Sequence, residues 1–206
     1  INDSKIDLNV NASSLTPSFE YRRFFSNHHQ WQNDIADQTV VDINASFSFK
    51  SLVLQHRFFE INNPIYFNHL ANPHQFNGKS QVLQTALKHE LLFNKFHLKS
   101  QVVYQYQGGA QVYQLPDFVS SIDLSYIVKP KQNHFKLFFG LKTKLFSEFN
   151  LMDYDPVLNS FLVNNSLIQK KYFISDFEFK FMLNNVTFYT LLTHLNAGLL
   201  GNNYFT

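Results

Sequence analysis

Eleven charged side chains are the residues of this chain whose types and positions are best suited to chemistry. They occupy one register of stretches in which polar and apolar residues alternate, and alternate residues of a strand point to the same face. Such a face could attract ions from water, or its charges could only hydrate and pair with one another. Both interpretations stay open for the set, which comprises Arg57, Lys88, Glu90, Lys99, Asp123, Lys136, Lys142, Lys144, Asp176, Glu178 and Lys180.

Three lysines of this set form a basic stripe. Lys136, Lys142 and Lys144 belong to one stretch and share its polar register. On the wall of a water-filled passage, the sign of such charges tunes ion selectivity. The stripe therefore predicts a mild preference for anions. Neutralising all three lysines is expected to abolish that preference, which a reversal potential would measure.

Patterns typical of catalysis and metal binding are absent from the sequence. No Gly-x-Ser-x-Gly, P-loop or His-Glu-x-x-His motif occurs. Cysteine is absent too, which excludes disulfides, thiolate chemistry and Cys-ligated zinc. Among the acids of the charged set, Glu90 alone adjoins a histidine, and His89 would point to the opposite face of that strand. We therefore predict no enzyme activity, no cofactor and no metal site.

The composition excludes some partners and favours others. The formal net charge is +2 with no basic run, so no nucleic-acid partner is expected. The chain holds 24 Phe and 10 Tyr against 16% charged residues, a load that suits an apolar band with aromatic girdles in a membrane. The mean hydropathy of −0.21 is compatible with this, because polar loops and one polar face lower the average.

The alternation is clearest in residues 135–149. One register holds Phe135, Leu137, Phe139, Leu141 and Leu145 and is almost wholly apolar, while the other mixes lysines with a few aromatics. The run is much longer than the usual strand of about 5–6 residues. A strand of this length with one apolar side fits a bilayer-spanning β-strand.

Roughly ten such strands are expected. Short turns near 15–17, 49–50, 94–95, 130–133 and 184–185 alternate with longer connections near 30–37, 62–79, 108–117 and 148–171. This rhythm predicts an all-β, antiparallel up-and-down transmembrane β-barrel. An extra strand pair is expected within 157–169. The predicted strands are 4–13, 18–29, 38–49, 51–61, 80–93, 96–107, 118–129, 134–147, 172–183 and 186–196.

Histidines are expected to serve the barrel wall and not a metal. His28 and His29 would point to opposite faces of a strand, which is poor geometry for one site. His56, His89 and His194 fall on otherwise apolar faces. An amphipathic ring suits such a position close to the lipid headgroups.

The C-terminal part resembles a known family. His194-Leu-Asn-Ala-Gly-Leu, followed by Gly201-Asn-Asn-Tyr, resembles a signature of the "putative porin" family of Bacteroidota outer membranes. Tyr154-Asp-Pro-Val-Leu followed by Phe161-Leu-Val-Asn, the strand 172–183 and Leu115-Pro116 also resemble family segments. The resemblance is clearest over residues 90–206. It implies an outer-membrane β-barrel with a passive pore and no catalytic residues.

The ends of the chain depart from the family pattern. The family continues past its Gly-Asn-Asn-Tyr loop into a further strand, whereas this sequence stops at Thr206 and starts without a signal peptide. A barrel in lipid leaves no unpaired edge. Residues 1–206 are therefore expected to form a single barrel domain that lacks its C-terminal strand and further N-terminal strands.

Three functions from different classes follow from these observations. The leading one is a porin-like channel of the bacterial outer membrane for passive diffusion of small hydrophilic solutes or ions. The second is a non-conducting barrel subunit or scaffold of a larger outer-membrane complex. The third is a soluble β-sandwich that binds ligands, for which Trp31 is the one tryptophan available as a platform. Expected partners are outer-membrane lipids, small hydrophilic solutes and other outer-membrane proteins.

Overall fold

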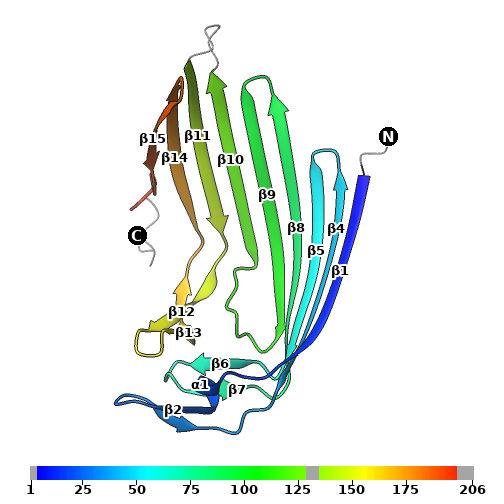
Figure 1. Cartoon of the computed structure of the whole chain (residues 1–206), viewed down its shortest axis with the longest axis vertical. Coiled ribbons are helices and arrows are strands. Elements are labelled where there is room, and N and C mark those ends of the chain that lie inside the picture. Colours follow the sequence, from blue (N-terminus) through cyan, green and yellow to red (C-terminus); the bar gives the residue numbers. More distant parts are fainter. Residues whose placement is uncertain (1–3, 129–134, 199–206) are drawn as a thin grey trace.

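A nine-stranded antiparallel sheet dominates the molecule (Figure 1). The computed structural model describes residues 4–128 and 135–198. The strand order is β1-β4-β5-β8-β9-β10-β11-β14-β15, so the sheet strands follow one another as they do along the chain. Their bounds are β1 (Ser4–Leu15), β4 (Gln38–Phe49), β5 (Leu52–Asn62), β8 (Lys79–Phe93), β9 (Phe96–Gly109), β10 (Phe118–Val128), β11 (Phe135–Phe146), β14 (Tyr172–Leu183) and β15 (Val186–Leu192).

The predicted up-and-down arrangement is confirmed. Two-residue turns at 50–51, 94–95 and 184–185 join β4 to β5, β8 to β9 and β14 to β15. The first residue of each turn has a positive φ: 51° at Lys50, 54° at Asn94 and 50° at Asn184. Tight hairpin turns need this geometry, and asparagine tolerates it well. Longer connections join the other ends of the strands, and the expected turn at 130–133 lies outside the described residues.

One of the expected strands, 18–29, is wrong, and so is the expected tight turn at 15–17. The chain there forms the short helix α1 (Phe19–Arg22) and the hairpin of β2 (Arg23–Phe25) and β3 (Gln30–Gln32). Its aromatic residues pack together and do not share one face of a strand: the rings of Phe24 and Trp31 stack at 4.8 Å. The segment therefore belongs to a long connection between β1 and β4.

The apolar register makes a continuous apolar face across all nine strands. One row of cross-strand partners runs through Val10, Ile43, Phe58, Leu83 and Tyr106. A second row continues to the other edge through Leu91, Leu98, Leu124, Leu141, Phe177 and Leu192.

This apolar face is uncovered. Val10 is 63% exposed and Leu141 43% exposed, and among the described residues no second sheet packs on it. Soluble monomers rarely expose apolar patches beyond a few hundred Å². The arrangement is therefore that of a barrel wall and not of the soluble β-sandwich, whose two sheets would bury these residues.

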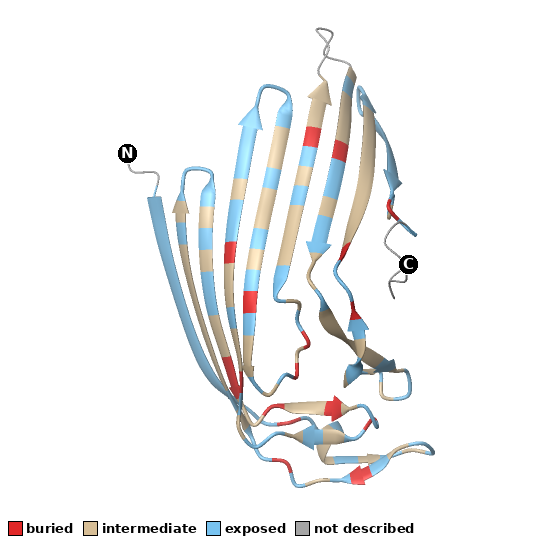
Figure 2. Ribbon diagram, turned by 180° about the vertical axis from the view of Figure 1, so that it is seen from behind, coloured by how far each residue is buried: buried red, intermediate tan, exposed pale blue. Residues whose placement is uncertain are grey.

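A small cap of loop elements lies at the long-connection end of the strands (Figure 1). It contains a four-stranded sheet in the order β12-β13-β6-β7. A strand pair was expected within residues 157–169, but that segment holds only β13, and its partner β12 precedes the segment. A small core of Trp31, Phe67, Ala71 and Leu162 joins three connections, and Figure 2 shows buried positions recurring in this region. The cap strands are β6 (Ile65–Asn68), β7 (Pro73–Gln75), β12 (Phe149–Asp155) and β13 (Ser160–Gln169).

Candidate functional site: the polar face of the sheet

All eleven charged residues of the sequence prediction lie in the register opposite the apolar face. They are carried by five strands, β5, β8, β9, β10 and β11, and by the neighbouring strand β14. Cross-strand partners lie on the same face of a sheet. Lys99 pairs with Asp123, Asp123 pairs with Lys142, and the other members follow at even spacings along their strands. We call this surface the polar face.

One row of the polar face alternates in charge across five strands. Glu90, Lys99, Asp123, Lys142 and Asp176 are successive cross-strand partners from β8 to β14. Opposite charges at directly facing positions stabilise a sheet, whereas like charges would destabilise it. This part of the wall is therefore nearly neutral although it is densely charged.

The basic stripe is divided by ion pairs. Lys142 Nζ lies 3.2 Å from Glu178 Oε2, and Lys180 Nζ lies 2.7 Å from the other oxygen of that carboxylate. In the described part of the chain no ion pair reaches Lys136 or Lys144. The cross-strand partner of Lys136 is Met182. Lys144 belongs to a row of cross-strand partners that ends three strands away at Lys88. The three lysines are thus not equivalent, and Lys142 is the one whose charge is matched.

Two residues that pair with charges of the polar face, Asp42 and His97, were not identified from the sequence. Arg57 donates two hydrogen bonds to Asp42, at 2.8 and 2.7 Å, in a bidentate pair. His97 Nε2 lies 2.6 Å from Glu90 Oε1, which also lies 3.5 Å from Lys99 Nζ. Both pairs are diagonal between neighbouring strands. Alternation places their members on one face, but only the register brings them together.

The connection 110–117 between β9 and β10 folds over the polar face, and we call it the inward segment. The Gln105 side chain on β9 donates to the carbonyl of Pro116, and Ser80 Oγ donates to the carbonyl of Ala110 at 2.6 Å. The ring of Tyr113 meets Phe59 on β5 edge-on, with centroids 5.9 Å apart. The segment is thereby fixed to strands far from it in the sequence, since Phe59 precedes Tyr113 by about fifty residues.

Gly109 allows the chain to turn at the start of the inward segment. Its φ is +70°, and a Cβ atom there would collide with the carbonyl oxygen of Lys79. Glycine adopts this backbone geometry without a steric penalty. Any other residue would force β9 and the neighbouring strand apart where the inward segment leaves the sheet.

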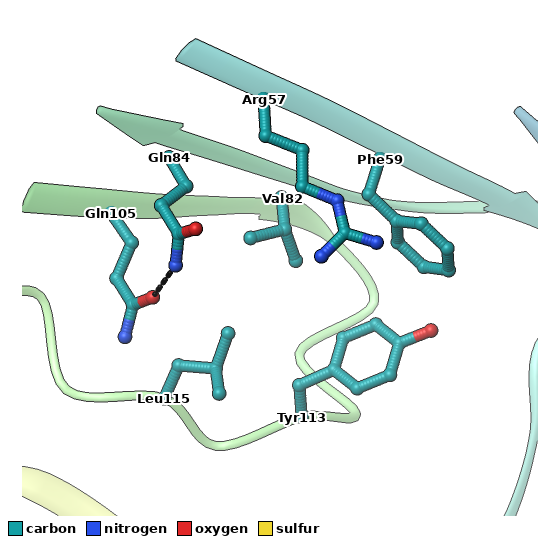
Figure 3. Close-up of a pocket in the computed structure, with 7 residues that line it drawn as sticks. All are labelled: Arg57, Phe59, Val82, Gln84, Gln105, Tyr113 and Leu115. Carbon is teal, nitrogen blue, oxygen red and sulfur yellow. Dashed lines mark hydrogen bonds between the residues drawn. The ribbon is translucent and has the colours of Figure 1, made fainter. Parts of the chain in front are cut away.

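A cavity of about 270 Å³ lies between the inward segment and the polar face (Figure 3). Tyr113 and Leu115 line it from the segment, opposite Arg57 and Gln84 from the strands. Gln84 donates to Gln105 Oε1 at 3.0 Å, so the amides on this wall are joined. Burial raises the pKa of the Tyr113 phenol, which therefore stays neutral. The groups that line this cavity are thus neutral or paired.

A turn in the cap joins distant connections. Asp155 Oδ1 accepts hydrogen bonds from the backbone N–H groups of Val157, at 2.8 Å, and Leu158, at 3.1 Å. Its other oxygen lies 3.1 Å from His29 Nε2 in the β2–β3 hairpin. The N–H of Leu158, with that of Val157 and with His29, lowers the pKa of Asp155. The charged carboxylate thus stabilises both the turn and the contact.

The cap turn is expected to loosen in acid. A carboxyl with a lowered folded-state pKa contributes stability above its ordinary pKa of about 3.9, and that contribution is lost as pH falls through the folded value. Amide protection factors at Val157 and Leu158, measured by hydrogen exchange, should therefore fall below about pH 4. In the control variant Asp155→Asn they should stay constant with pH. Equal pH profiles in both proteins would contradict this role of Asp155.

Neither metal clusters nor spanning helices are found in the described ranges. No three His, Cys, Asp or Glu side chains gather there as metal ligands would. No helix in residues 4–128 or 135–198 has the length and apolar character needed to cross a membrane. The sequence placed His28 and His29 on a strand, but in the structure they lie in the turn between β2 and β3.

Comparisons with known proteins agree with this fold. The chain is similar to the ferric-catecholate import receptor Fiu from E. coli K12 in its closed form, with a TM-score of 0.60 and 12% identity. The match covers 94% of this chain but 29% of the receptor, so the chain spans less than a third of that protein's length. At this identity the likeness shows a shared β-barrel fold alone.

No curated protein matches the chain. A family model described as "Putative porin" matches residues 1–206, and this family and the receptor likeness point to the outer membrane of bacteria. The resemblance seen in the C-terminal motifs is thereby confirmed over the whole chain, although the Gly201-Asn-Asn-Tyr part of the motif lies outside the described residues. The chain belongs to the putative porin family.

Proposed function

We propose that this chain forms part of the wall of a porin-like channel in the bacterial outer membrane, through which small hydrophilic solutes or ions diffuse passively. The observation that carries the proposal is the separation of the two faces. Every member of the charged set lies on the polar face, opposite an uncovered apolar face that crosses nine strands. A sheet with these faces suits lipid on one side and water on the other.

The eleven charged residues would then line the lumen. Ion pairs such as Lys180–Glu178 and the alternating row reduce their net effect. Weak overall selectivity is therefore expected, with sign set by the lysines that lack carboxylate partners. Among the described residues the edge strands of the sheet are β1 and β15, and in lipid both need partner strands. We propose that these residues are one portion of a larger barrel domain.

The inward segment would set the width of the passage. It crosses the polar face between β5, β8 and β9, where Tyr113 and Leu115 face Arg57 (Figure 3). Because the segment is held by side chains of three strands, it is expected to remain in place during permeation. Solutes would pass beside it and not displace it.

Planar-bilayer recording of the full-length protein tests the channel directly. Steps of conductance that rise linearly with salt concentration, together with swelling of loaded liposomes in small sugars, are the expected results. Heat-modifiable migration on a gel shows that the barrel is folded in the same preparation. A folded barrel with no conductance would contradict the channel and favour the non-conducting scaffold.

A further inference from the structure

A lysine-lined depression on the polar face is separate from the cavity beneath the inward segment. It has a volume of about 460 Å³ and is floored by two neighbouring rows of side chains. One row is Lys88, Gln101, Ser121 and Lys144, which are successive cross-strand partners from β8 to β11. The other is the part of the alternating row formed by Glu90, Lys99, Asp123 and Lys142. Four lysines against two carboxylates leave the floor with an excess of positive charge.

The two rows differ in how their charges are matched. In the alternating row Lys99 lies 3.5 Å from Glu90, Lys142 lies 3.2 Å from Glu178, and Asp123 is flanked in register by both lysines. In the other row Lys88 has a neutral partner, Gln55 Oε1 at 3.4 Å. Lys144 makes no ion pair within the described residues. The unmatched charge therefore resides on Lys88 and Lys144.

Lys50 also borders the depression but does not add to this charge. Its ammonium lies 5.3 Å from the centroid of the Phe49 ring. Phe49 lies in the apolar register, where it pairs with Leu52. The Lys50 ammonium above its ring is therefore directed toward the apolar face and away from the polar face. The charged groups available to a ligand are thus those of the two rows.

The spacing of the first row suits a small oxyanion. Lys88 and Lys144 stand three strand intervals apart, which is about 14 Å between their Cα atoms. Two flexible four-carbon side chains that lean inward leave room for one small anion between their ammonium groups. Gln101 and Ser121 lie beneath that point and are half-buried, and each carries a hydrogen-bond donor.

We infer that this depression binds a small multivalent oxyanion of the phosphate class. Lys88 and Lys144 hold the anion from two sides, and the Gln101 amide and the Ser121 hydroxyl donate to its oxygens. Charge-assisted hydrogen bonds to an oxyanion are stronger than those between neutral groups. This inference rests on the proposed function in one respect, which is that the polar face is open to water.

Equilibrium dialysis of the detergent-purified full-length protein with radiolabelled inorganic phosphate tests the site without any need for conduction. The double variant Lys88→Gln/Lys144→Gln is expected to weaken phosphate binding at least about tenfold. The matched control is Lys5→Gln/Lys136→Gln, which removes the same charge from the same face outside the depression. That control is expected to keep the Kd within about twofold. Ser121→Ala, which keeps all charges, should weaken binding by several-fold.

The outcomes separate the site from the channel. Equal loss of binding in both double variants, or displacement of phosphate by chloride at equal ionic strength, would overturn the site, because either result means unspecific charge attraction. Heat-modifiable migration checks that each variant is folded. If the double variant does not fold, phosphate binding by Ser121→Ala tests the site in its place. Phosphate binding by a protein that never conducts contradicts the channel alone.

Discussion

Replacing Val102 by arginine is expected to destabilise the folded protein in lipid by about 2–4 kcal/mol. Val102 lies midway along β9 on the apolar face and is 39% exposed. Its neighbours across the sheet are Leu87 and Ser120, so no carboxylate faces it in register. An arginine at this depth would have to leave water for hydrocarbon. Urea unfolding of the full-length protein in vesicles measures the change in free energy.

The adjacent residue provides the matched control. Gln101 precedes Val102 on β9 and points to the polar face, so Gln101→Arg is expected to cost less than about 1 kcal/mol. The two variants carry the same added group at the same depth and differ only in the face they present. Similar losses of stability, or a larger loss for Gln101→Arg, would mean that the apolar face does not meet lipid.

Replacing residues 111–116 by two glycines is expected to raise single-channel conductance about twofold or more, because the pore diameter limits the flow of ions. This change removes Tyr113 and Leu115 from the narrowed passage but keeps Gly109, which the turn out of β9 requires. Planar-bilayer recording of the full-length variant measures the effect. The strand ends remain joined, so the wall itself should fold as before.

A graded pair of substitutions separates the side chains from the backbone of the inward segment. Tyr113→Ala removes the ring that contacts Phe59 and should raise conductance by a smaller amount than the replacement. Gln111→Ala changes an exposed residue that does not line the cavity, and it should leave conductance unchanged. Unchanged conductance in both the replacement and Tyr113→Ala would show that the segment does not narrow the path of the ions.

The combination of these results would locate the water-filled side of the wall. The Val102 variant tests whether the apolar face meets lipid, while the inward-segment variants test the polar face where that segment crosses it. The cap lies beyond both, at the long-connection end, and its Trp31–Phe67 core ties three connections together. Loosening of the cap in acid is therefore expected to change access to the passage without unfolding the strands.

Much of the wall was predictable because strand alternation is a local property. In β11 each residue has one of two directions, so the sequence alone assigns Leu141 and Lys142 to opposite faces. Length and turn residues, such as Asn94-Lys95, likewise predict where the strands begin and end. The segment 18–29 was mistaken for a strand because its aromatic residues alternate as in a strand. Their rings instead pack on Trp31, later in the same connection, and on Phe67 in another connection.

The sequence by itself thus determined the fold class, the membership of each charged residue in one face, and the rhythm of turns and long connections. Only the tertiary structure decided which charges meet. Glu90 with His97, Arg57 with Asp42 and the row from Lys88 to Lys144 all depend on the register between strands. A slip of one residue would change every such pair while leaving the pattern along each strand the same. The inward segment was hidden for a related reason, since its position depends on contacts with strands far away in the chain.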